Sequence, residues 1–291
     1  MKIVKLCAVD EPAYLIVNAD DYGYFSCISR GILDGGENGL ITATGVIANS
    51  HNFSEHLHRL KAAAYLDAGV HLNLSYGRPL TNRMERKLGK RGGKFPGKYP
   101  VLFELLTGKL TIEDILEEWR AQIWRCTDAG LKIYFLNTHE HLHAFPALFE
   151  AIMLLKKEYK VPYIRFPEPE WDAWGGARGM VRNALLQCIR GLNRFSAPED
   201  APRVLGISNS GKLTRAYLKK RLLSLEKGKI YELMCHPGYF DPAEIKDKRL
   251  RSYHRWEQEL ELLKSQEVRG LCNARGVRVV RYSDLQGKPR A

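Results

Sequence analysis

The sequence predicts an α/β protein whose parallel strands close, or nearly close, into a (β/α) barrel. Two observations lead to this prediction. Short β-rich runs alternate with amphipathic helical stretches from end to end, and no run of consecutive strands interrupts the alternation. Successive βα units favour parallel pairing of the strands. The chain has 291 residues, and single barrels of about 250 residues are common. We therefore predict one domain over residues 1–291, with an open, doubly wound sheet as the alternative.

Eight runs of β-branched, aromatic and other apolar residues are the predicted strands. They lie at 14–18, 44–48, 69–74, 133–137, 162–166, 203–207, 230–235 and 277–281.

Three of the helices predicted between these strands have clear sequence signals. Thr111 and Asp114 form a capping box ahead of an apolar stripe, and Gly130 follows as a stop. Pro146 opens the next helix. The apolar stripes of these and a third helix are expected in the core: Ile112, Leu116, Trp119 and Ile123; Leu148, Ile152, Leu155 and Tyr159; Leu218, Leu222 and Leu225.

Two irregular insertions, at about 77–110 and 167–202, interrupt the alternation. The first contains the stretch 83–98, which has seven basic residues against one acid and four glycines. We expect this basic loop to be mobile and to emerge beside the active site, because it follows the third strand. There it could close over an anionic sugar, a phosphate-bearing glycolipid or a membrane surface, or remain a solvated loop without a ligand. In the second insertion, Trp171 and Trp174 could stack on a sugar ring, although burial is the favoured expectation for each.

Charge and cysteine content limit the partners and the compartment. The net charge is +12 and the sequence pI is about 9.4, which would suit a nucleic acid, an anionic membrane surface or an acidic substrate. No nucleic-acid-binding motif accompanies this charge, so we expect no specific nucleic-acid partner. No signal peptide or transmembrane segment is apparent, and the six scattered cysteines form no CxxC pair. We expect a cytoplasmic protein, and leave peripheral membrane contact and homo-oligomerisation open.

Polar side chains gather at the ends of five predicted strands. In α/β barrels this end carries the functional residues. The first strand leads into Asp20 and Asp21, the third presents His71 and Asn73, the fourth leads into Asn137, His139, His141 and His143, the fifth ends in Arg165, and the seventh leads into His236. Because carboxylate, imidazole and guanidinium groups would meet at one edge of the sheet, we predict a catalytic site there.

The adjacent carboxylates Asp20 and Asp21 have two interpretations. In a hydrolase, one carboxylate can hold a metal ion while its neighbour removes a proton from water. Asp-Asp before an aromatic residue and a glycine is also typical of a simple turn. On these residues alone the turn is favoured, so the interpretation depends on the other strand ends.

The three histidines that follow the fourth strand suggest a metal site. His139, His141 and His143 alternate with other residues, so in an extended backbone all three rings would point to one side. One or two of them could bind a divalent ion together with a remote histidine and a carboxylate. The same residues also fit the zinc-protease pattern, His139-Glu140-x-x-His143. That pattern requires a helix, whereas here a β-like run precedes it and Pro146 begins a new helix, which disfavours a protease.

Five blocks together resemble the YdjC-like carbohydrate deacetylases, which include chitooligosaccharide deacetylase and the hopanoid-biosynthesis-associated deacetylase-like proteins. They are Asn18-Ala-Asp-Asp-Tyr-Gly23, Gly31-Ile-Leu with Gly39-Leu-Ile-Thr-Ala-Thr44, Gly69-Val-His-Leu-Asn-Leu74 with Gly77-Arg-Pro-Leu80, Thr138-His-Glu-His-Leu-His143, and Met234-Cys-His-Pro-Gly238. The blocks are ordered as in that family and cover residues from about 13 to 283.

The resemblance implies a barrel related to the polysaccharide deacetylases and a role for each matching residue. Asp21, His71 and His139 correspond to metal ligands, Asp20 to the general base and His236 to the acid. Arg165 resembles the arginine that orients the catalytic carboxylate. Asn18, Tyr22, Asn73, Asn137, His141 and His143 are then candidates to contact the substrate or support the ligands. Many family members have Asp where this chain has Asn137, so a negative partner for the histidines is absent or supplied elsewhere.

The expected function is a metal-dependent hydrolase that removes N-acetyl groups from amino sugars. One divalent ion, Mg²⁺ or Zn²⁺, would activate a water molecule and polarise the acetamide carbonyl group. The sugar could belong to an oligosaccharide or to a glycolipid, and could be anionic. The alternative function is a barrel that binds metal or carbohydrate without catalysis.

Overall fold

The computed structural model describes residues 11–89, 92–171, 176–192 and 201–285. All eight predicted strands are present, and every pairing between them is parallel. They are β1 (Ala13–Tyr22), β2 (Ala43–Val46), β3 (Asp67–Leu72), β4 (Ile133–Thr138), β5 (Tyr163–Ile164), β6 (Arg203–Leu205), β7 (Ile230–Cys235) and β8 (Val277–Val279). The prediction of a parallel α/β sheet is therefore confirmed.

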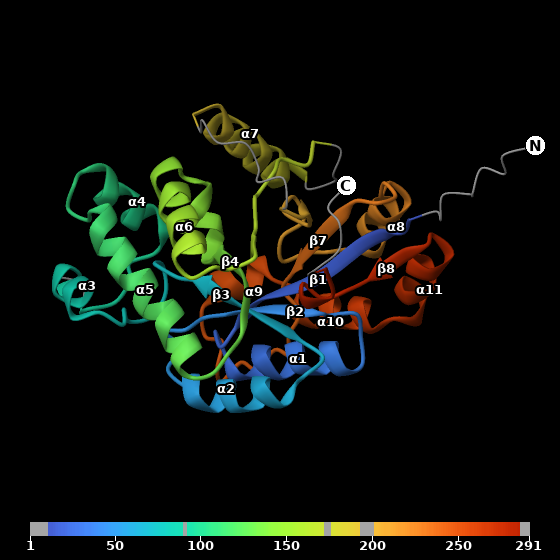
Figure 1. The fold of residues 1–291 in the computed structure, drawn as a ribbon, viewed down its shortest axis with the longest axis horizontal. Coiled ribbons are helices and arrows are strands. Elements are labelled where there is room, and N and C mark those ends of the chain that lie inside the picture. Colours follow the sequence, from blue (N-terminus) through green and yellow to red (C-terminus); the bar gives the residue numbers. More distant parts are fainter. Residues whose placement is uncertain (1–10, 90–91, 172–175, 193–200, 286–291) are drawn as a thin grey trace, which may run out of the picture.

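The sheet curves into an incompletely closed barrel (Figure 1). Its strand order is β5-β4-β3-β2-β1-β7-β6, and β8 pairs with β1 off this path. The two ends of the path meet at a single parallel bridge between Phe166 and Arg203. The central strand β1 is buried along its whole length and contacts three others. Its continuous apolar run is typical of such a fully covered parallel strand.

Helices cover the outside of the sheet. They are α1 (Ser26–Glu37), α2 (Phe53–Ala62), α3 (Asn82–Lys87), α4 (Lys98–Leu106), α5 (Ile112–Asp128), α6 (Pro146–Glu158), α7 (Gly176–Leu192), α8 (Arg215–Leu223), α9 (Lys248–Tyr253), α10 (Trp256–Lys264) and α11 (Gln266–Ala274), with short 3₁₀ helices η2 (His139–Ala144) and η3 (Ser283–Leu285). Each helix in the described ranges is too short or too polar to span a lipid bilayer.

The predicted helix signals agree with the structure. Thr111 Oγ1 accepts a hydrogen bond from the Asp114 backbone N–H at 3.3 Å, and the Asp114 carboxylate accepts one from the Thr111 N–H at 2.8 Å. Trp119 and Ile123 of the α5 stripe are fully buried. Pro146 begins α6. The local sequence thus fixes where both helices begin and which face enters the core.

The described residues of the first insertion contain more helix and more buried side chains than its composition predicts. We expected a mobile basic loop at 83–98 that could build no core, but α3 occupies its first part. Met84, Leu88 and Phe95 are buried. Arg83 and Lys87 both reach the buried carboxylate of Asp114, each at 2.5 Å. The expectation was wrong for these residues because a few apolar anchors and one buried acid compensate the high charge.

The second insertion also departs from expectation. Trp171 is 58% exposed, so its predicted burial is wrong, and Trp174 lies outside the described residues. Asn183 of α7 joins this insertion to the barrel through Glu170: its Nδ2 donates to the Glu170 carbonyl oxygen at 2.8 Å, and its Oδ1 accepts from the Glu170 N–H at 3.1 Å.

A close approach between two glycines fixes the loop after β7. A Cβ atom on Gly31 of α1 would lie 2.5 Å from the Cα atom of Gly238. Only glycine therefore allows α1 to pack directly against this loop. The loop carries His236, so the packing of α1 helps to determine where that histidine lies.

Candidate metal centre

The two adjacent carboxylates, Asp20 and Asp21, are among the last three residues of β1. The prediction placed them after the end of this strand. The register of β1 with β2 shifts between Ala19 and Tyr22. Asp21 has a φ of 72°, a backbone conformation that residues other than glycine seldom adopt. This irregularity gives Asp20 and Asp21 different surroundings, and backbone of this kind is often found at functional sites.

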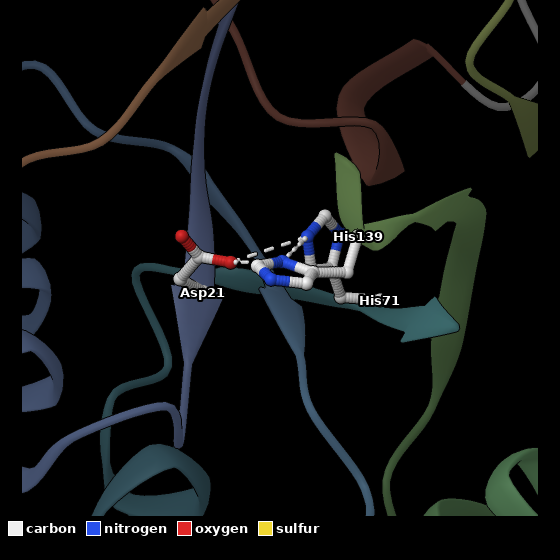
Figure 2. A group of neighbouring side chains, drawn as sticks. All are labelled: Asp21, His71 and His139. Carbon is white, nitrogen blue, oxygen red and sulfur yellow. Dashed lines mark hydrogen bonds and ion pairs between the residues drawn. The ribbon is translucent and has the colours of Figure 1, made fainter. Parts of the chain in front are cut away.

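Asp21, His71 and His139 converge on one point (Figure 2). The Asp21 Oδ1 atom lies 2.8 Å from His139 Nδ1 and 3.3 Å from His71 Nε2, and the two imidazole nitrogens are 3.4 Å apart. Asp21 and His71 are buried and His139 is nearly so. The three side chains come from the ends of β1, β3 and β4, which are widely separated in sequence.

The electrostatics of this cluster attract a positive charge. Burial alone would raise the pKa of Asp21, but the neighbouring His139 outweighs it and holds that pKa well below its usual range. Burial likewise opposes protonation of His139, yet the Asp21 carboxylate raises the pKa of this imidazole. A buried carboxylate requires a compensating charge, which either a proton or a metal cation supplies.

The donor set fits a divalent ion. Zinc bonds of about 2.1 Å place tetrahedral ligand atoms about 3.4 Å apart, close to the two longer separations in the cluster. Two imidazoles and one carboxylate are also a ligand set that leaves coordination positions open. Among the described residues, this is the one group of three or more His, Cys, Asp and Glu side chains that could hold a metal ion.

Asn137 fixes the orientation of the His71 ring. Its Oδ1 atom lies 2.7 Å from His71 Nδ1, and its Nδ2 donates to Asp20 Oδ1 at 3.1 Å. Since the amide nitrogen faces the Asp20 carboxylate, the amide oxygen must accept the proton of His71 Nδ1. The lone pair of His71 Nε2 is then free to face the cluster, as a metal ligand requires.

Asp20 is held by a buried ion pair. The two guanidinium nitrogens of Arg165 donate to its two oxygens at 2.6 and 2.8 Å. Burial acts to raise the pKa of Asp20, but the charge of Arg165 outweighs it and holds the pKa far below the usual range. Arg165 also donates from Nε to Glu232 Oε1 at 2.7 Å. Asp20 is therefore an ionised carboxylate in a fixed orientation.

The segment after β4 is not extended, which corrects one prediction. Residues His139–Ala144 form the 3₁₀ helix η2, and Glu140 and His141 inside it have φ values of 56° and 55°. The imidazoles consequently do not share one side. His143 turns inward, where its Nδ1 accepts from Thr138 Oγ1 at 2.6 Å and its Nε2 donates to the Arg165 carbonyl oxygen at 2.9 Å.

These contacts also bear on the protease alternative. His139 and His143 would both have to face one metal ion from a regular helix. His143 is instead completely buried and bonded through both ring nitrogens. Its neighbour His141 packs its ring 6.4 Å from that of His143. The geometry of η2 therefore disagrees with a zinc-protease motif, and His143 supports Arg165.

His236 lies on the loop after β7 in a mainly buried environment. Its backbone N–H donates to Glu259 Oε2 at 2.6 Å. Its ring stands 5.0 Å from that of His254, which stacks on Trp256. The electrostatic influence of His236 on Asp20 is smaller than that of Arg165 or His71.

Three other predicted site residues support the barrel, not the metal cluster. Asn18 is buried and donates to Glu232 at 2.9 Å. Asn73 closes the turn after β3, where its Oδ1 accepts from the backbone N–H groups of Ser75 and Tyr76. The buried Tyr22 hydroxyl donates to the His56 carbonyl oxygen, so it is engaged within the protein.

Sequence reasoning missed Glu232 and Glu259. Both are completely buried, one accepting from Arg165 and Asn18, the other from the backbone N–H groups of His236 and Leu213. Glu232 had a readable signal, because a lone acid inside the apolar strand Ile230–Cys235 requires a partner. Glu259 lies on the amphipathic helix α10, where nothing distinguished it from a solvent-facing acid.

The fold and site define a class: a parallel, incompletely closed α/β barrel with a carboxylate–imidazole cluster at the strand ends. The sequence profile of the YdjC-like protein family matches residues 14–274. The chain belongs to the YdjC-like family.

Curated proteins named carbohydrate deacetylases are similar to this chain over most of its length. A carbohydrate deacetylase of Clostridium beijerinckii is 27% identical over 93% of this chain and 99% of its own length. Another, of Geobacillus stearothermophilus, is 30% identical over 79% and 81% of the two chains. A solved structure from Enterococcus faecalis V583, whose name refers to cellobiose-phosphate cleavage, has a TM-score of 0.72 at 22% identity and covers 94% of this chain and 99% of that one. This last likeness supports the fold.

Proposed function

We propose that this protein is a metal-dependent hydrolase that removes acetyl groups from N-acetylated amino sugars. The observation that carries the proposal is the Asp21–His71–His139 cluster beside an ionised Asp20. The similar proteins named carbohydrate deacetylases support the substrate class. A hydrolase of this kind needs a metal site and a base in one place, and the same edge of the sheet supplies both groups.

Asp21, His71 and His139 are the proposed ligands of one divalent ion. When bound, such an ion lowers the pKa of a water molecule and polarises a carbonyl group. The two imidazoles favour Zn²⁺ over Mg²⁺, which prefers oxygen ligands and a largely hydrated shell. Asn137 would keep His71 in the tautomer that presents Nε2 to the ion.

Asp20 is the proposed general base. Three hydrogen bonds from Arg165 and Asn137 fix its carboxylate, and a carboxylate has about four acceptor positions. One position therefore remains for the attacking water. Because Arg165 stabilises the ionised form, Asp20 is unprotonated at neutral pH, and its lowered pKa makes it a weak base that releases an accepted proton readily.

His236 is the proposed general acid. Its backbone is held by Glu259, and the close packing of Gly31 against Gly238 fixes the loop that carries it. A protonated imidazole in this position would donate to the departing amine of the sugar. The remaining product is acetate.

The test is acetate release from a panel of N-acetylhexosamine oligosaccharides and glycolipids by metal-loaded protein. We expect the wild type to cleave at least one member. Asp20→Asn should retain metal and lose at least about a hundredfold in rate, as removal of a general base does. His71→Ala should lose the metal. If wild-type protein with bound metal cleaves no member, the chain is a non-catalytic binding protein and the proposal fails.

A further inference from the structure

Helix α7 presents an apolar stripe to solvent. Met180, Val181 and Leu185 are 62%, 69% and 56% exposed, and Ala184 and Cys188 are exposed as well. At 100° per residue these five positions fall within an arc of about 140°. An exposed, continuous apolar face on a helix is unusual in a protein without a partner for it.

The opposite face of α7 is already packed. Asn183 forms its two hydrogen bonds with the backbone of Glu170, and Leu186 belongs to a small core cluster with Ile207 and Met234. The orientation of the helix is therefore determined by its buried side. The apolar stripe therefore lies on the solvent-facing side of a helix whose other side already packs against the protein.

Helix α4 of the first insertion repeats this arrangement. Tyr99, Phe103 and Leu106 are 73%, 60% and 70% exposed, and their spacing of four and three residues places them on one side of the helix. Val101 and Glu104 are buried on the other side. Both insertions thus carry a helix that is packed on one face and apolar on the free one.

Both helices adjoin the segment that carries His139. The Lys98 ammonium group at the start of α4 lies 3.5 Å from the carboxylate of Glu140, the residue after His139. Helix α7 contacts η2. Figure 1 shows α4, α6 and α7 along the same upper margin of the barrel. A surface bound by α4 and α7 would therefore lie close to the proposed metal site.

The charge of the segments around α4 and α7 indicates which kind of surface these helices would bind. Residues 86–112 hold seven Lys and Arg against one acid, Glu104, which is buried. Helix α7 contains three arginines and no acid. Exposed apolar side chains within a cationic segment are typical of helices that bind anionic lipid surfaces. A symmetric contact with a second copy would bring these like charges together.

We propose that the free faces of α4 and α7 dock on an anionic lipid bilayer and hold the site at its surface. This goes beyond the proposed hydrolysis, because docking would proceed with or without catalysis. The apolar side chains would enter the headgroup region, and the basic residues of both segments would be attracted by the negative surface potential.

Vesicle co-sedimentation tests this proposal. We expect wild-type protein to bind phosphatidylcholine vesicles that contain phosphatidylglycerol, to bind pure phosphatidylcholine far more weakly, and to dissociate as salt increases. The triple variant Met180→Ser/Val181→Ser/Leu185→Ser and the double variant Phe103→Ser/Leu106→Ser should each weaken binding at least about tenfold. Leu223→Ser, at a 45% exposed position on α8, is the matched control.

Circular dichroism and acetate release from a soluble substrate show whether each variant is folded. Failure of the wild type to bind anionic vesicles overturns the proposal, as does equal binding by the control and the variants. A stable dimer that the triple variant dissociates would also overturn it, since the stripe would then be a contact between copies. Vesicle binding is measured without turnover, so its failure is distinct from failure of the proposed deacetylation.

Discussion

The Oδ1 atom of Asn137 lies 2.7 Å from Nδ1 of His71, while the other end of the same amide donates to Asp20. One neutral side chain thus connects a proposed metal ligand to the proposed base. A carboxylate at this position would face Asp20 across the same short distance, and two such charges repel each other. The asparagine provides an acceptor for the imidazole and a donor for the base.

Replacement of Asn137 should weaken metal binding. Loss of an outer hydrogen-bond partner typically reduces metal affinity about 10–100-fold, and we expect this for Asn137→Ala measured by competition with a metal-binding dye. Asn49→Ala is the matched control, because Asn49 also bonds through its amide but contacts Asn73 and backbone carbonyls. Equal affinity in the two variants would show that Asn137 does not orient His71.

Removal of Arg165 should shift the pH dependence of the reaction. In Arg165→Met, burial would still raise the pKa of Asp20 while the opposing guanidinium charge is gone. Asp20 would then become protonated at higher pH, so the acidic limb of kcat/KM should move to higher pH. The profile is measured on metal-loaded protein. An unchanged acidic limb would argue that Asp20 is not the titrating base.

The same variant should be less stable. Arg165 is buried between Asp20 and Glu232, and breaking such a network leaves uncompensated buried charge, which costs about 3–5 kcal/mol. Chemical unfolding at neutral pH measures the loss. Arg120→Met, which removes an exposed pair with Glu158, should cost less than about 1 kcal/mol.

His143 should make the fold sensitive to acid. Burial, assisted by the charge of Arg165, lowers the pKa of His143 to about 3 from its ordinary 6.5. The folded state thus binds fewer protons than the unfolded state between these values, so stability falls as pH falls from 6.5 towards 3. Between pH 7.5 and pH 5, the free energy of unfolding of His143→Gln should therefore decrease by up to about 2 kcal/mol less than that of the wild type. The control is His58→Gln at an exposed position, whose free energy of unfolding should change over this pH range as that of the wild type does.

Glu140→Gln separates the proposed reaction from a zinc protease. In a His-Glu-x-x-His protease this glutamate is the base, and its loss would abolish activity. Here Glu140 pairs with Lys98 at 3.5 Å near the surface, so we expect a loss of less than about tenfold in acetate release. Abolished turnover with metal still bound would contradict the assignment of Asp20 as base.

Much of the fold could be predicted because local signals agreed with it. The run Ile230–Cys235 is a predicted strand whose bounds the structure reproduces, and the capping box at Thr111 begins α5 as expected. Placing Asp21, His71 and His139 at the ends of parallel strands predicted that they lie at one edge of the sheet, and the resemblance to the YdjC-like family selected these three as a set. In these cases periodicity and position in the fold determine the geometry.

The remaining differences depend on contacts that the sequence does not display. Glu140 and His141 adopt left-handed backbone conformations in η2, so the alternation of histidines was a misleading guide to their directions. The part of the basic loop that contains Arg83 and Lys87 is helical, and both side chains bind Asp114, far along the chain. Such tertiary pairs override local composition.

The most direct test of the central claim is a metal titration of chelator-treated protein, followed by acetate release from a cleaved N-acetylated amino sugar. Our account predicts no release without metal, a linear increase to a maximum at one equivalent of divalent ion per chain, and no recovery in His71→Ala. Full activity of the metal-free protein, or full recovery of His71→Ala at one equivalent, would contradict it.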